Sequence, residues 1–459
     1  MSLQNEWQKR DRKVLWHPFT QHQLWEKEEF PVIGRGEGIY LYDLEGRKYI
    51  DGVSSLWVSA HGHNHPGLNQ AITAQLSRIA HSTFLGLSHQ PGIELAEDLL
   101  KIAPPGLSRV FYAENGASAV EIALKMAFQY WQNRGEKKRK KFIGFSTGYH
   151  GDTIGAMSLS GVELFNQVYQ PLLFEVWRAP LPRCYKCPED RGDCEEDKWQ
   201  CLAKLKILAE EHSPELAGII IEPMVQAAGG MIVQPKGYLK AVEMLCRQHK
   251  ILLIADEVAV GLGRLGKNFA CELGFVQPDL LVLGKALGAG YLPIACVMST
   301  EKIFSAFLGK HHSDRTFFHG HTYTANPLAC SAALAGLELM KKEKRLENVN
   351  ARARQIEQWI PKFKQLPIVF HFSHLGLLAG IELIKDREKC VEFSPEEMIG
   401  LQVARSARKR GAILRPLGNV VVLMPPLIIS ESELEELMEI TFESINEVGA
   451  QFIAPENRA

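Results

Sequence analysis

The chain lacks the features that mark membrane, fibrous and disordered proteins. In its 459 residues, no apolar run reaches the roughly 18–20 residues that a bilayer-spanning helix needs. No Gly-X-Y or heptad repeat suggests a fibre, and a hydrophobic content of 46% argues against disorder. The 52 Lys and Arg residues balance 53 Asp and Glu, so charge favours neither nucleic acid nor an anionic membrane as a partner. The charged start, residues 1–13, has no apolar core of a signal peptide, and we expect a cytoplasmic enzyme.

The nine cysteines fall into two groups, and neither predicts a disulfide framework, since no secretion signal is seen. Five are scattered through apolar segments and are expected in the core: Cys246, Cys271, Cys296, Cys330 and Cys390. The other four lie close together: Cys184, Cys187, Cys194 and Cys201. Only the first pair has the C-x-x-C spacing of a zinc knuckle. We expect four thiols in an exposed insertion and no metal, with a structural zinc or iron–sulfur site as the alternative.

The middle of the chain alternates short apolar runs with amphipathic helical segments. The runs are residues 109–112, 142–145, 217–221, 251–255, 280–283 and 294–298. They show little internal alternation, which is typical of strands buried on both faces of a largely parallel sheet. The segment 119–131 between two of them has one apolar helical face, formed by Val120, Ala123, Leu124, Ala127 and Trp131. An α/β domain is therefore predicted.

The two ends of the chain have a different pattern. Residues 38–43 and 48–51 predict a β-hairpin with its turn at 44–47. From about residue 335, charged helices, two or three strands and an acidic terminal helix indicate a smaller α+β domain. We expect residues 66–335 to form the large domain, and residues 1–65 to join residues 336–459 in the small one.

Chemically active side chains follow the predicted strands, where an open parallel sheet binds its ligands. These stretches are Glu114-Asn115-Gly116, Tyr149-His150, Glu222-Pro223, Asp256-Glu257 and Gly284-Lys285. A lysine held in a low-dielectric pocket loses its proton more easily and can form a Schiff base with an aldehyde such as pyridoxal phosphate. Taken alone, Lys285 fits better with a lysine whose amine reaches solvent at a strand end.

Three other positions would complete such a site. Asp256 can keep a pyridine nitrogen protonated, although an N-cap is the equal alternative. The free N–H groups of Gly116 and Ala117 can bind a phosphate at the start of the helix, and plain capping by Asn115 is the alternative. Tyr149 can stack on a planar cofactor or lie in a surface loop.

Two further motifs look like ligand sites but are predicted to be something else. Residues 261–266 match the glycine pattern of a dinucleotide-binding turn, but Asp256 and Glu257 stand before the glycines and would repel a diphosphate. A nicotinamide or flavin enzyme is therefore not expected. The histidine triplet in residues 61–65 precedes Pro66 and is interpreted as a structural turn rather than a metal site.

Several stretches together resemble the class III pyridoxal-phosphate aminotransferases over residues 15–430. They are Gly148-Tyr149-His150-Gly151, Glu222-Pro223 with Gln226, Asp256-Glu257-Val258, Gly261-Leu262-Gly263-Arg264 and Gly284-Lys285-Ala286-Leu287-Gly288. The resemblance implies the fold type I architecture, with a mostly parallel seven-stranded sheet in the large domain. It also implies a homodimer whose active sites lie at the subunit interface.

The resemblance implies roles for individual residues. Lys285 would bind the cofactor and move the substrate proton, Asp256 would pair with the pyridinium, and Tyr149 would lie along the ring. The residues implied to bind pyridoxal phosphate are Gly116, Ala117, Tyr149, Gln226, Asp256, Lys285 and, from the partner subunit, Thr322. The residues implied to bind substrate are Phe19, Trp57, Tyr149, Asp152, Arg264, Lys285, Gly320 and Arg415. The planar guanidinium of Arg415 would suit a substrate carboxylate.

Residues 15–20, 54–57, 148–153, 415–418 and 424–426 narrow the resemblance to the branch that converts 8-amino-7-oxononanoate to 7,8-diaminononanoate in biotin biosynthesis. Three positions depart from the family pattern: Ala117 replaces the usual Ser, Val260 the usual Thr, and Phe19 the Tyr typical of members that use S-adenosylmethionine. The amino donor therefore stays open between S-adenosylmethionine and lysine. The alternatives are another class III ω-aminotransferase with a different amine substrate, and a metal-stabilised binding protein on a degenerate scaffold.

Overall fold

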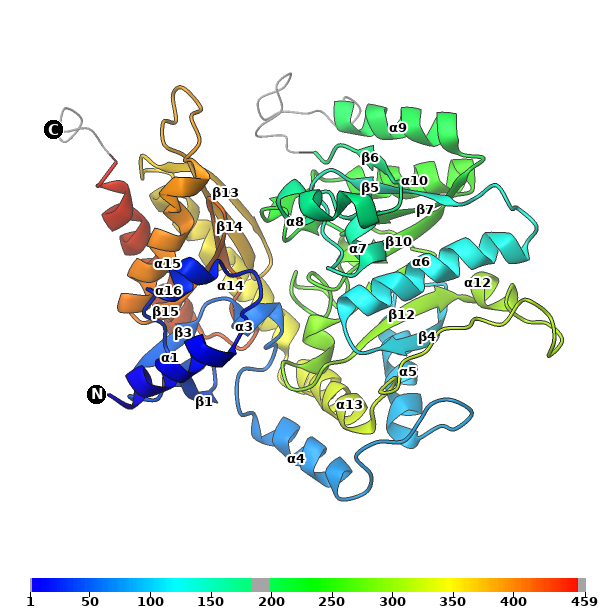
Figure 1. Cartoon of the computed structure of the whole chain (residues 1–459), viewed down its shortest axis with the longest axis horizontal. Helices are drawn as coiled ribbons and strands as arrows, with labels where there is room; N and C mark the ends of the chain where they lie inside the picture. Colours follow the sequence, from blue (N-terminus) through cyan, green and yellow to red (C-terminus); the bar gives the residue numbers. More distant parts are fainter. Residues whose placement is uncertain (1, 183–198, 453–459) are drawn as a thin grey trace.

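The protein is described here from a computed structural model, which covers residues 2–182 and 199–452. The middle of the chain builds one group of elements and the two ends build another, as the sequence colours of Figure 1 show. In the described part of the chain, no helix is long and apolar enough to cross a membrane.

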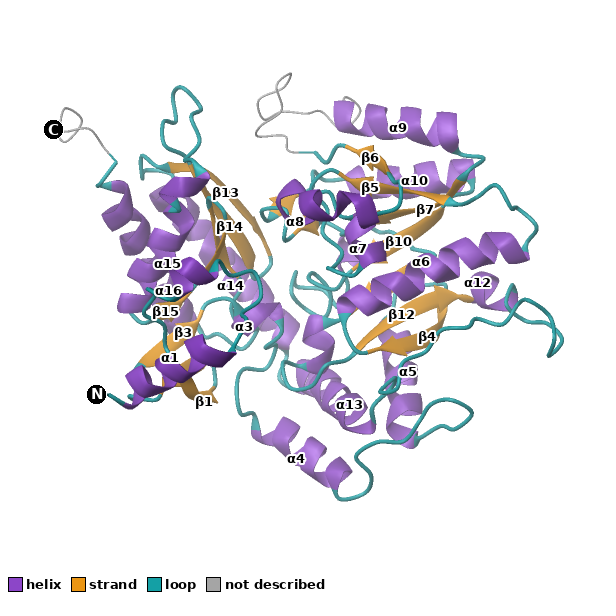
Figure 2. Cartoon of the chain, viewed as in Figure 1, coloured by secondary structure: helices purple, strands orange, loops and turns teal. Residues whose placement is uncertain are grey.

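A seven-stranded sheet forms the centre of the larger group (Figure 2). Its spatial order is β4 (Leu107–Ala113), β12 (Ala295–Thr300), β11 (Leu280–Leu283), β10 (Leu252–Asp256), β7 (Leu216–Ile221), β5 (Lys141–Phe145) and β6 (Trp177–Ala179). Six of the strands run in the same direction, and β12 alone runs in the opposite one. The mostly parallel sheet is as predicted, and each of the six apolar runs overlaps one of its strands. The sequence did not predict β6, because three residues are too short to show a pattern.

Helices cover both faces of this sheet and bury alternate residues of each strand. On one face, α6 (Gly116–Asn133) packs against Leu280 and Val282 of β11 and against residues of the neighbouring strands that point to the same side. Its predicted apolar face is buried. The helices of the other face are α5 (Gln90–Ile102), α9 (Gln200–His212), α10 (Tyr238–His249) and α13 (Pro327–Lys342). The shorter elements of this group are α4 (Pro66–Leu76), α7 (Ile154–Leu159), α8 (Glu163–Asn166), η1 (Gln167–Leu172), β8 (Val225–Gln226), β9 (Ile232–Val233), α11 (Ala270–Leu273), η3 (Lys285–Gly288) and α12 (Glu301–Ser305).

The chain ends meet in the smaller group, where β3 pairs in parallel with β15. One sheet has the order β1 (Ile33–Glu37), β2 (Tyr40–Asp43), β3 (Lys48–Asp51) and β15 (Ala412–Ile413). The other has the order β13 (Val369–Leu375), β14 (Leu378–Leu383), β17 (Val420–Leu423) and β16 (Arg415–Leu417). The helices are α1 (Leu3–Val14), α2 (His22–Trp25), α3 (Ser54–Trp57), α14 (Arg345–Phe363), η4 (Pro395–Glu397), α15 (Ile399–Lys409) and α16 (Glu431–Gly449). The domain limits at residues 65 and 335 stay a prediction.

Three details of this part differ from the sequence-based expectation. The hairpin strand predicted at 38–43 begins only at Tyr40, because Gly38 has a φ of 57° and turns the chain. An additional strand, β1, was missed because its two glycines suggest a loop. Cys390 was expected in the core but is exposed, since it lies in the turn between Asp386 and Val391.

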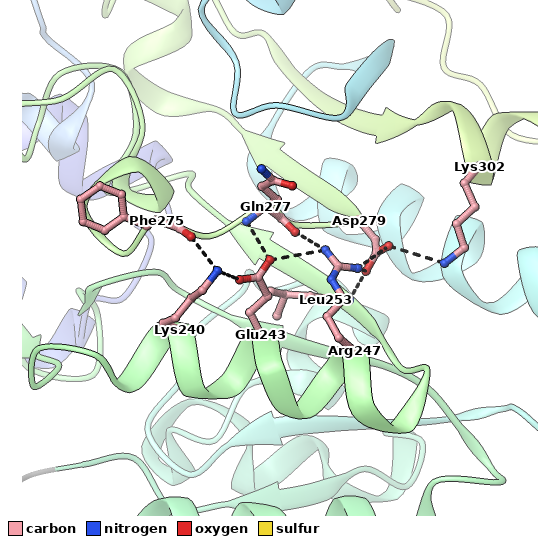
Figure 3. Close-up of polar contacts among 8 residues, drawn as sticks. All are labelled: Lys240, Glu243, Arg247, Leu253, Phe275, Gln277, Asp279 and Lys302. Atoms are coloured by element: carbon pink, nitrogen blue, oxygen red, sulfur yellow. Dashed lines mark hydrogen bonds and ion pairs between the residues drawn. The ribbon is translucent and has the colours of Figure 1, made fainter. Parts of the chain in front are cut away.

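A network of charged side chains anchors α10 to the amino ends of β10 and β11 (Figure 3). Asp279 is buried, and its two carboxylate oxygens lie 3.1 and 3.0 Å from Nη1 of Arg247. The Leu253 N–H also donates to Asp279, at 3.0 Å. Oε1 of Glu243, which lies on the same helix as Arg247, is 3.6 Å from Nη2 of Arg247. These contacts fix the ends of the strands that lie opposite the catalytic candidates.

Candidate active site

A cavity of about 430 Å³ opens at the carboxyl ends of the central strands. It is lined by seven of the predicted site residues, namely Trp57, Gly116, Ala117, Tyr149, Asp152, Asp256 and Lys285. Its wall also includes Asn115, His150, Gly151, Thr153, Glu222, Ala228, Val258 and Ala259. Strands β5, β7, β10 and β11 end at this edge, because they run parallel in the sheet.

Lys285 follows β11 directly after Gly284 and has a left-handed backbone with a φ of 43°. Its Nζ lies 4.9 Å from the centre of the Trp57 ring. Burial lowers the pKa of Lys285, and the negative charges of Asp256 and Glu222 oppose that shift only in part. A lysine in this setting releases its proton more easily than one in water, which a nucleophilic amine requires.

Asp256 ends β10, the strand beside β11, and is held from two sides. Its Oδ2 lies 2.7 Å from Nδ1 of His150, and its Oδ1 accepts a hydrogen bond from the Val258 N–H at 3.1 Å. Asp256 and His150 are both buried. Because Nδ1 faces a carboxylate, we assign the proton of a neutral imidazole to Nδ1. The opposite atom, Nε2, is buried and has no hydrogen-bond partner among the described residues.

Glu222 is a buried carboxylate at the end of β7, and the sequence pattern placed it at the rim without a role. It accepts hydrogen bonds from the backbone N–H groups of Tyr149, at 3.1 Å, and Ala227, at 3.0 Å. Burial raises the pKa of Glu222 to about 7. Burial also raises the pKa of Tyr149, and its hydrogen bond to Asp152 adds to that shift. Glu222 thus fixes the backbone of the aromatic residue that walls the cavity.

The amino end of α6 forms a cradle for an anion. Asn115 caps the helix by accepting a bond from the Ser118 N–H at 2.9 Å, which leaves Gly116 and Ala117 at the cavity wall. A Cβ atom on Gly116 would lie 2.7 Å from Cγ1 of Val258, so the backbone approaches closely here. A helix of 18 residues directs its positive end into the cavity, which favours a phosphate.

Phe19 and Arg415 lie outside the cavity wall but are linked to it by aromatic contacts. The guanidinium carbon of Arg415 lies 5.9 Å from the Phe19 ring centre. Phe165 is 5.3 Å from Phe19 and 5.8 Å from Tyr149, ring centre to ring centre. Gln226 is buried one layer behind the wall, where its Oε1 accepts a bond from the Thr147 hydroxyl at 2.5 Å.

Three further predicted residues do not line this cavity. Gly320 and Thr322 are exposed in a loop on another surface of the chain. Arg264 was expected on the substrate side, and it is not among the residues that line the cavity. Its guanidinium is buried and donates to the Leu377 and Pro425 carbonyls at 3.0 and 2.6 Å. Burial lowers the pKa of Arg264 to about 9. Through these carbonyls, Arg264 ties the turn after β10 to the small sheets.

The two candidate metal motifs are placed as follows. Cys184, Cys187 and Cys194 lie outside the described residues, and Cys201 is in α9. In the histidine triplet, Nε2 of His63 lies 2.9 Å from Oδ2 of Asp51, and Nε2 of His65 lies 3.4 Å from Oε1 of Glu343. His61 is buried, which lowers its pKa to about 4. Within residues 2–182 and 199–452, no three His, Cys, Asp or Glu side chains are arranged to hold a metal ion.

The cavity residues fit a planar, phosphate-bearing aldehyde such as pyridoxal phosphate. The helix start suits the phosphate, and Lys285 and Asp256 are placed for the aldehyde and a ring nitrogen. The wall also carries two buried nitrogens that lack partners in the described chain, Nε1 of Trp57 and Nε2 of His150. Such unsatisfied atoms are expected where a bound group completes a site.

Comparisons with known proteins agree with this chemistry. The family described as Aminotransferase class-III matches residues 23–445. The chain is 45% identical over 438 residues to the adenosylmethionine-8-amino-7-oxononanoate aminotransferase of Geobacter sulfurreducens, covering 95% of this chain and 97% of that protein. The Nitratidesulfovibrio vulgaris protein of the same name is 49% identical over 430 residues, with 93% and 79% covered.

Solved structures show the same likeness. The crystal structure of adenosylmethionine-8-amino-7-oxononanoate aminotransferase from Methanocaldococcus jannaschii superposes with a TM-score of 0.91 at 41% identity, covering 96% of this chain and 99% of that one. The omega transaminase of Pseudomonas jessenii in complex with PMP gives a TM-score of 0.92 at 30% identity, with 98% and 99% covered.

Proposed function

Because the chain belongs to the class III aminotransferases and has their fold type I architecture, we propose that it aminates 8-amino-7-oxononanoate to 7,8-diaminononanoate in biotin biosynthesis. The observation that carries the proposal is the cavity that brings Lys285, Asp256, Tyr149 and the start of α6 together. Class III aminotransferases depend in general on pyridoxal phosphate, and this cofactor is the one proposed here.

The residues at the centre of the cavity have distinct tasks in this proposal. Bound pyridoxal phosphate supplies an electron sink for the negative charge that develops on a substrate carbon. The N–H groups of Gly116 and Ala117 hold the phosphate. Asp256 keeps the ring nitrogen protonated, and His150 orients this carboxylate from 2.7 Å. Lys285, with its lowered pKa, accepts the proton from the substrate carbon and returns it.

Substrate selection is assigned to the aromatic and charged residues at the cavity mouth. Arg415 would bind the carboxylate of the oxononanoate, because a guanidinium forms paired hydrogen bonds with that group. Trp57 and Tyr149 would confine the substrate chain, and Asp152 would face the amino donor. Phe19 stands beside Arg415, so the choice between S-adenosylmethionine and lysine as donor would be made there.

We place Gly320 and Thr322 in the active site of a second subunit, which makes the enzyme a homodimer. Support comes from the surface around them, where the exposed apolar residues Leu85, Phe318 and Tyr323 suit contact with another copy. The cytoplasm is the compartment proposed. We also propose that the two domains have the predicted limits at residues 65 and 335.

Two variants test the proposal. Lys285→Ala should abolish turnover and leave the fold intact, because the side chain is at the cavity wall and not in the core; near-normal activity would reject the mechanism. Arg415→Ala should raise KM for the oxononanoate about a hundredfold, the cost of a charged hydrogen-bonded pair, while KM for the donor changes little. Arg415→Lys is the control that keeps the charge. If Arg415→Ala instead raised only the KM for the amino donor, a different ω-aminotransferase substrate would be indicated.

A further inference from the structure

Four polar side chains outside the cavity form a continuous line across the surface that carries Gly320 and Thr322. Nζ of Lys125, on α6, lies 3.0 Å from Nδ1 of His319. Nε2 of His319 lies 3.1 Å from Nε2 of His321. Nδ1 of His321 lies 2.5 Å from Oε2 of Glu114, which follows β4. The line therefore begins at an ammonium group and ends at a carboxylate.

The two charged ends determine where each proton in the line lies. Lysine can only donate, so Nδ1 of His319 accepts and its proton is on Nε2. That proton is donated to Nε2 of His321, whose own proton is then on Nδ1. This Nδ1–H donates to Glu114, which can only accept. The hydrogen bonds thus run in one direction, and both imidazoles are neutral.

The line ties the loop to the element that forms the phosphate cradle. Glu114 stands two residues before Gly116 in the sequence, and the loop residue Gly320 lies between the two histidines. Further contacts also hold the loop. The His321 N–H donates to the Thr324 hydroxyl at 3.1 Å, and the His319 ring stacks on Phe317 at 5.8 Å between ring centres.

We propose that Lys125, His319, His321 and Glu114 are positioning residues that hold the loop of residues 319–322 in the shape needed to complete the cofactor site of a partner subunit. This inference rests on the proposed function, because it takes Gly320 and Thr322 as contributors to the partner's site. The four residues act through the loop and do not touch the reacting atoms.

The direction of the line makes it sensitive to acid. A proton added to Nδ1 of His319 would point at the ammonium of Lys125, and one added to Nε2 of His321 would oppose the proton of His319. The titratable groups that face His319 are Lys125, Glu121, Glu114 and His321. Burial lowers the pKa of His319, and the positive charge of Lys125 adds to that shift, so the intact line persists through neutral pH.

Hydrogen exchange in the cofactor-free protein tests the line without any appeal to catalysis. His321→Ala should speed exchange in residues 317–324 about tenfold at pH 8, the effect of losing hydrogen bonds to a charged partner. His312→Ala, a change of the same kind at an exposed histidine nearby, is the control. After correction for the intrinsic exchange rate, the difference between the wild-type protein and His321→Ala should shrink as the pH is lowered into the acid range.

His321→Asn separates a positioning role from a merely structural one. Asparagine keeps an N–H toward Glu114 but cannot take a proton, so protection should be restored in part. Its dependence on pH should be weaker than in the wild-type protein, because only His319 can still take a proton. Equal exchange in all four proteins at pH 8 would overturn the proposal.

Binding of pyridoxal phosphate to the same apoproteins tests the link to the partner's site. We expect the Kd to rise about tenfold in His321→Ala at pH 8 and to stay unchanged in His312→Ala. Altered exchange with an unchanged Kd would overturn the role of the loop in the cofactor site. Failure of the wild-type protein to bind the cofactor would reject the proposed function itself, while the exchange result would still decide whether the line holds the loop.

Discussion

Replacing Glu222 with Gln would show how strongly the cavity resists a buried negative charge. Glu222 is 3% exposed, and burial raises its pKa to about 7 from an ordinary value of 4.5. Between these two values the folded protein keeps the proton, whereas the unfolded chain releases it. Raising the pH through this window therefore favours unfolding of the wild-type protein. Glutamine has no proton to lose, so the variant escapes this effect.

The size of the effect follows from the difference between the two pKa values, which corresponds to about 3 kcal/mol. A second contribution does not depend on pH. Both Glu222 oxygens accept backbone N–H bonds, and the amide nitrogen of Gln would oppose one of them, which costs about 1–3 kcal/mol. The variant should be less stable than wild type at pH 5 and should recover about 3 kcal/mol relative to it by pH 8.

Urea denaturation of the apoproteins at pH 5 to 8, followed by tryptophan fluorescence, measures this difference. Glu257→Gln is a matched control, since burial also raises the pKa of Glu257 to about 7 but the residue does not line the cavity. Both variants should show the same pH trend, and only Glu222→Gln should weaken cofactor binding through Tyr149. A stability difference that is constant with pH would refute the reasoning.

Three further substitutions test other parts of the structure. Gly116→Ala should weaken cofactor binding at least tenfold, because its Cβ would lie 2.7 Å from Val258 and displace the cradle; equilibrium titration of the apoprotein measures this. Ala117→Ser should tighten binding about tenfold by adding a hydroxyl donor, and the same titration decides it. Asp279→Asn should lower the free energy of unfolding by about 2 kcal/mol, since Arg247 loses its buried partner, with no change in the cofactor Kd.

The central sheet could be predicted from the sequence because its strands are buried on both faces. Strands β7, β10 and β11 are buried at every position, so they appear as uninterrupted apolar runs. The missed elements lack that signal. β1 contains two glycines, and β6 has only three residues, so their pairing depends on neighbouring strands and not on their own composition.

The cavity was predictable for a related reason, since parallel strands bring the residues that follow them to one edge. Lys285 and Asp256 come from adjacent strands and line the same wall. Contacts with distant segments could not be predicted in this way. Arg264 is oriented by carbonyls more than a hundred residues away, and the sequence near it carries no trace of them. The pairing of His150 with Asp256 likewise appears only when β5 and β10 enter one sheet.

The visible absorption spectrum of the purified protein loaded with pyridoxal phosphate tests the central claim most directly. We expect a yellow protein whose band is bleached by either S-adenosylmethionine or lysine and restored by 8-amino-7-oxononanoate, with 7,8-diaminononanoate formed in equal amount. Lys285→Ala should show neither change. A band that no donor bleaches, or one that the oxononanoate fails to restore, would contradict the assignment of this cavity to that transamination.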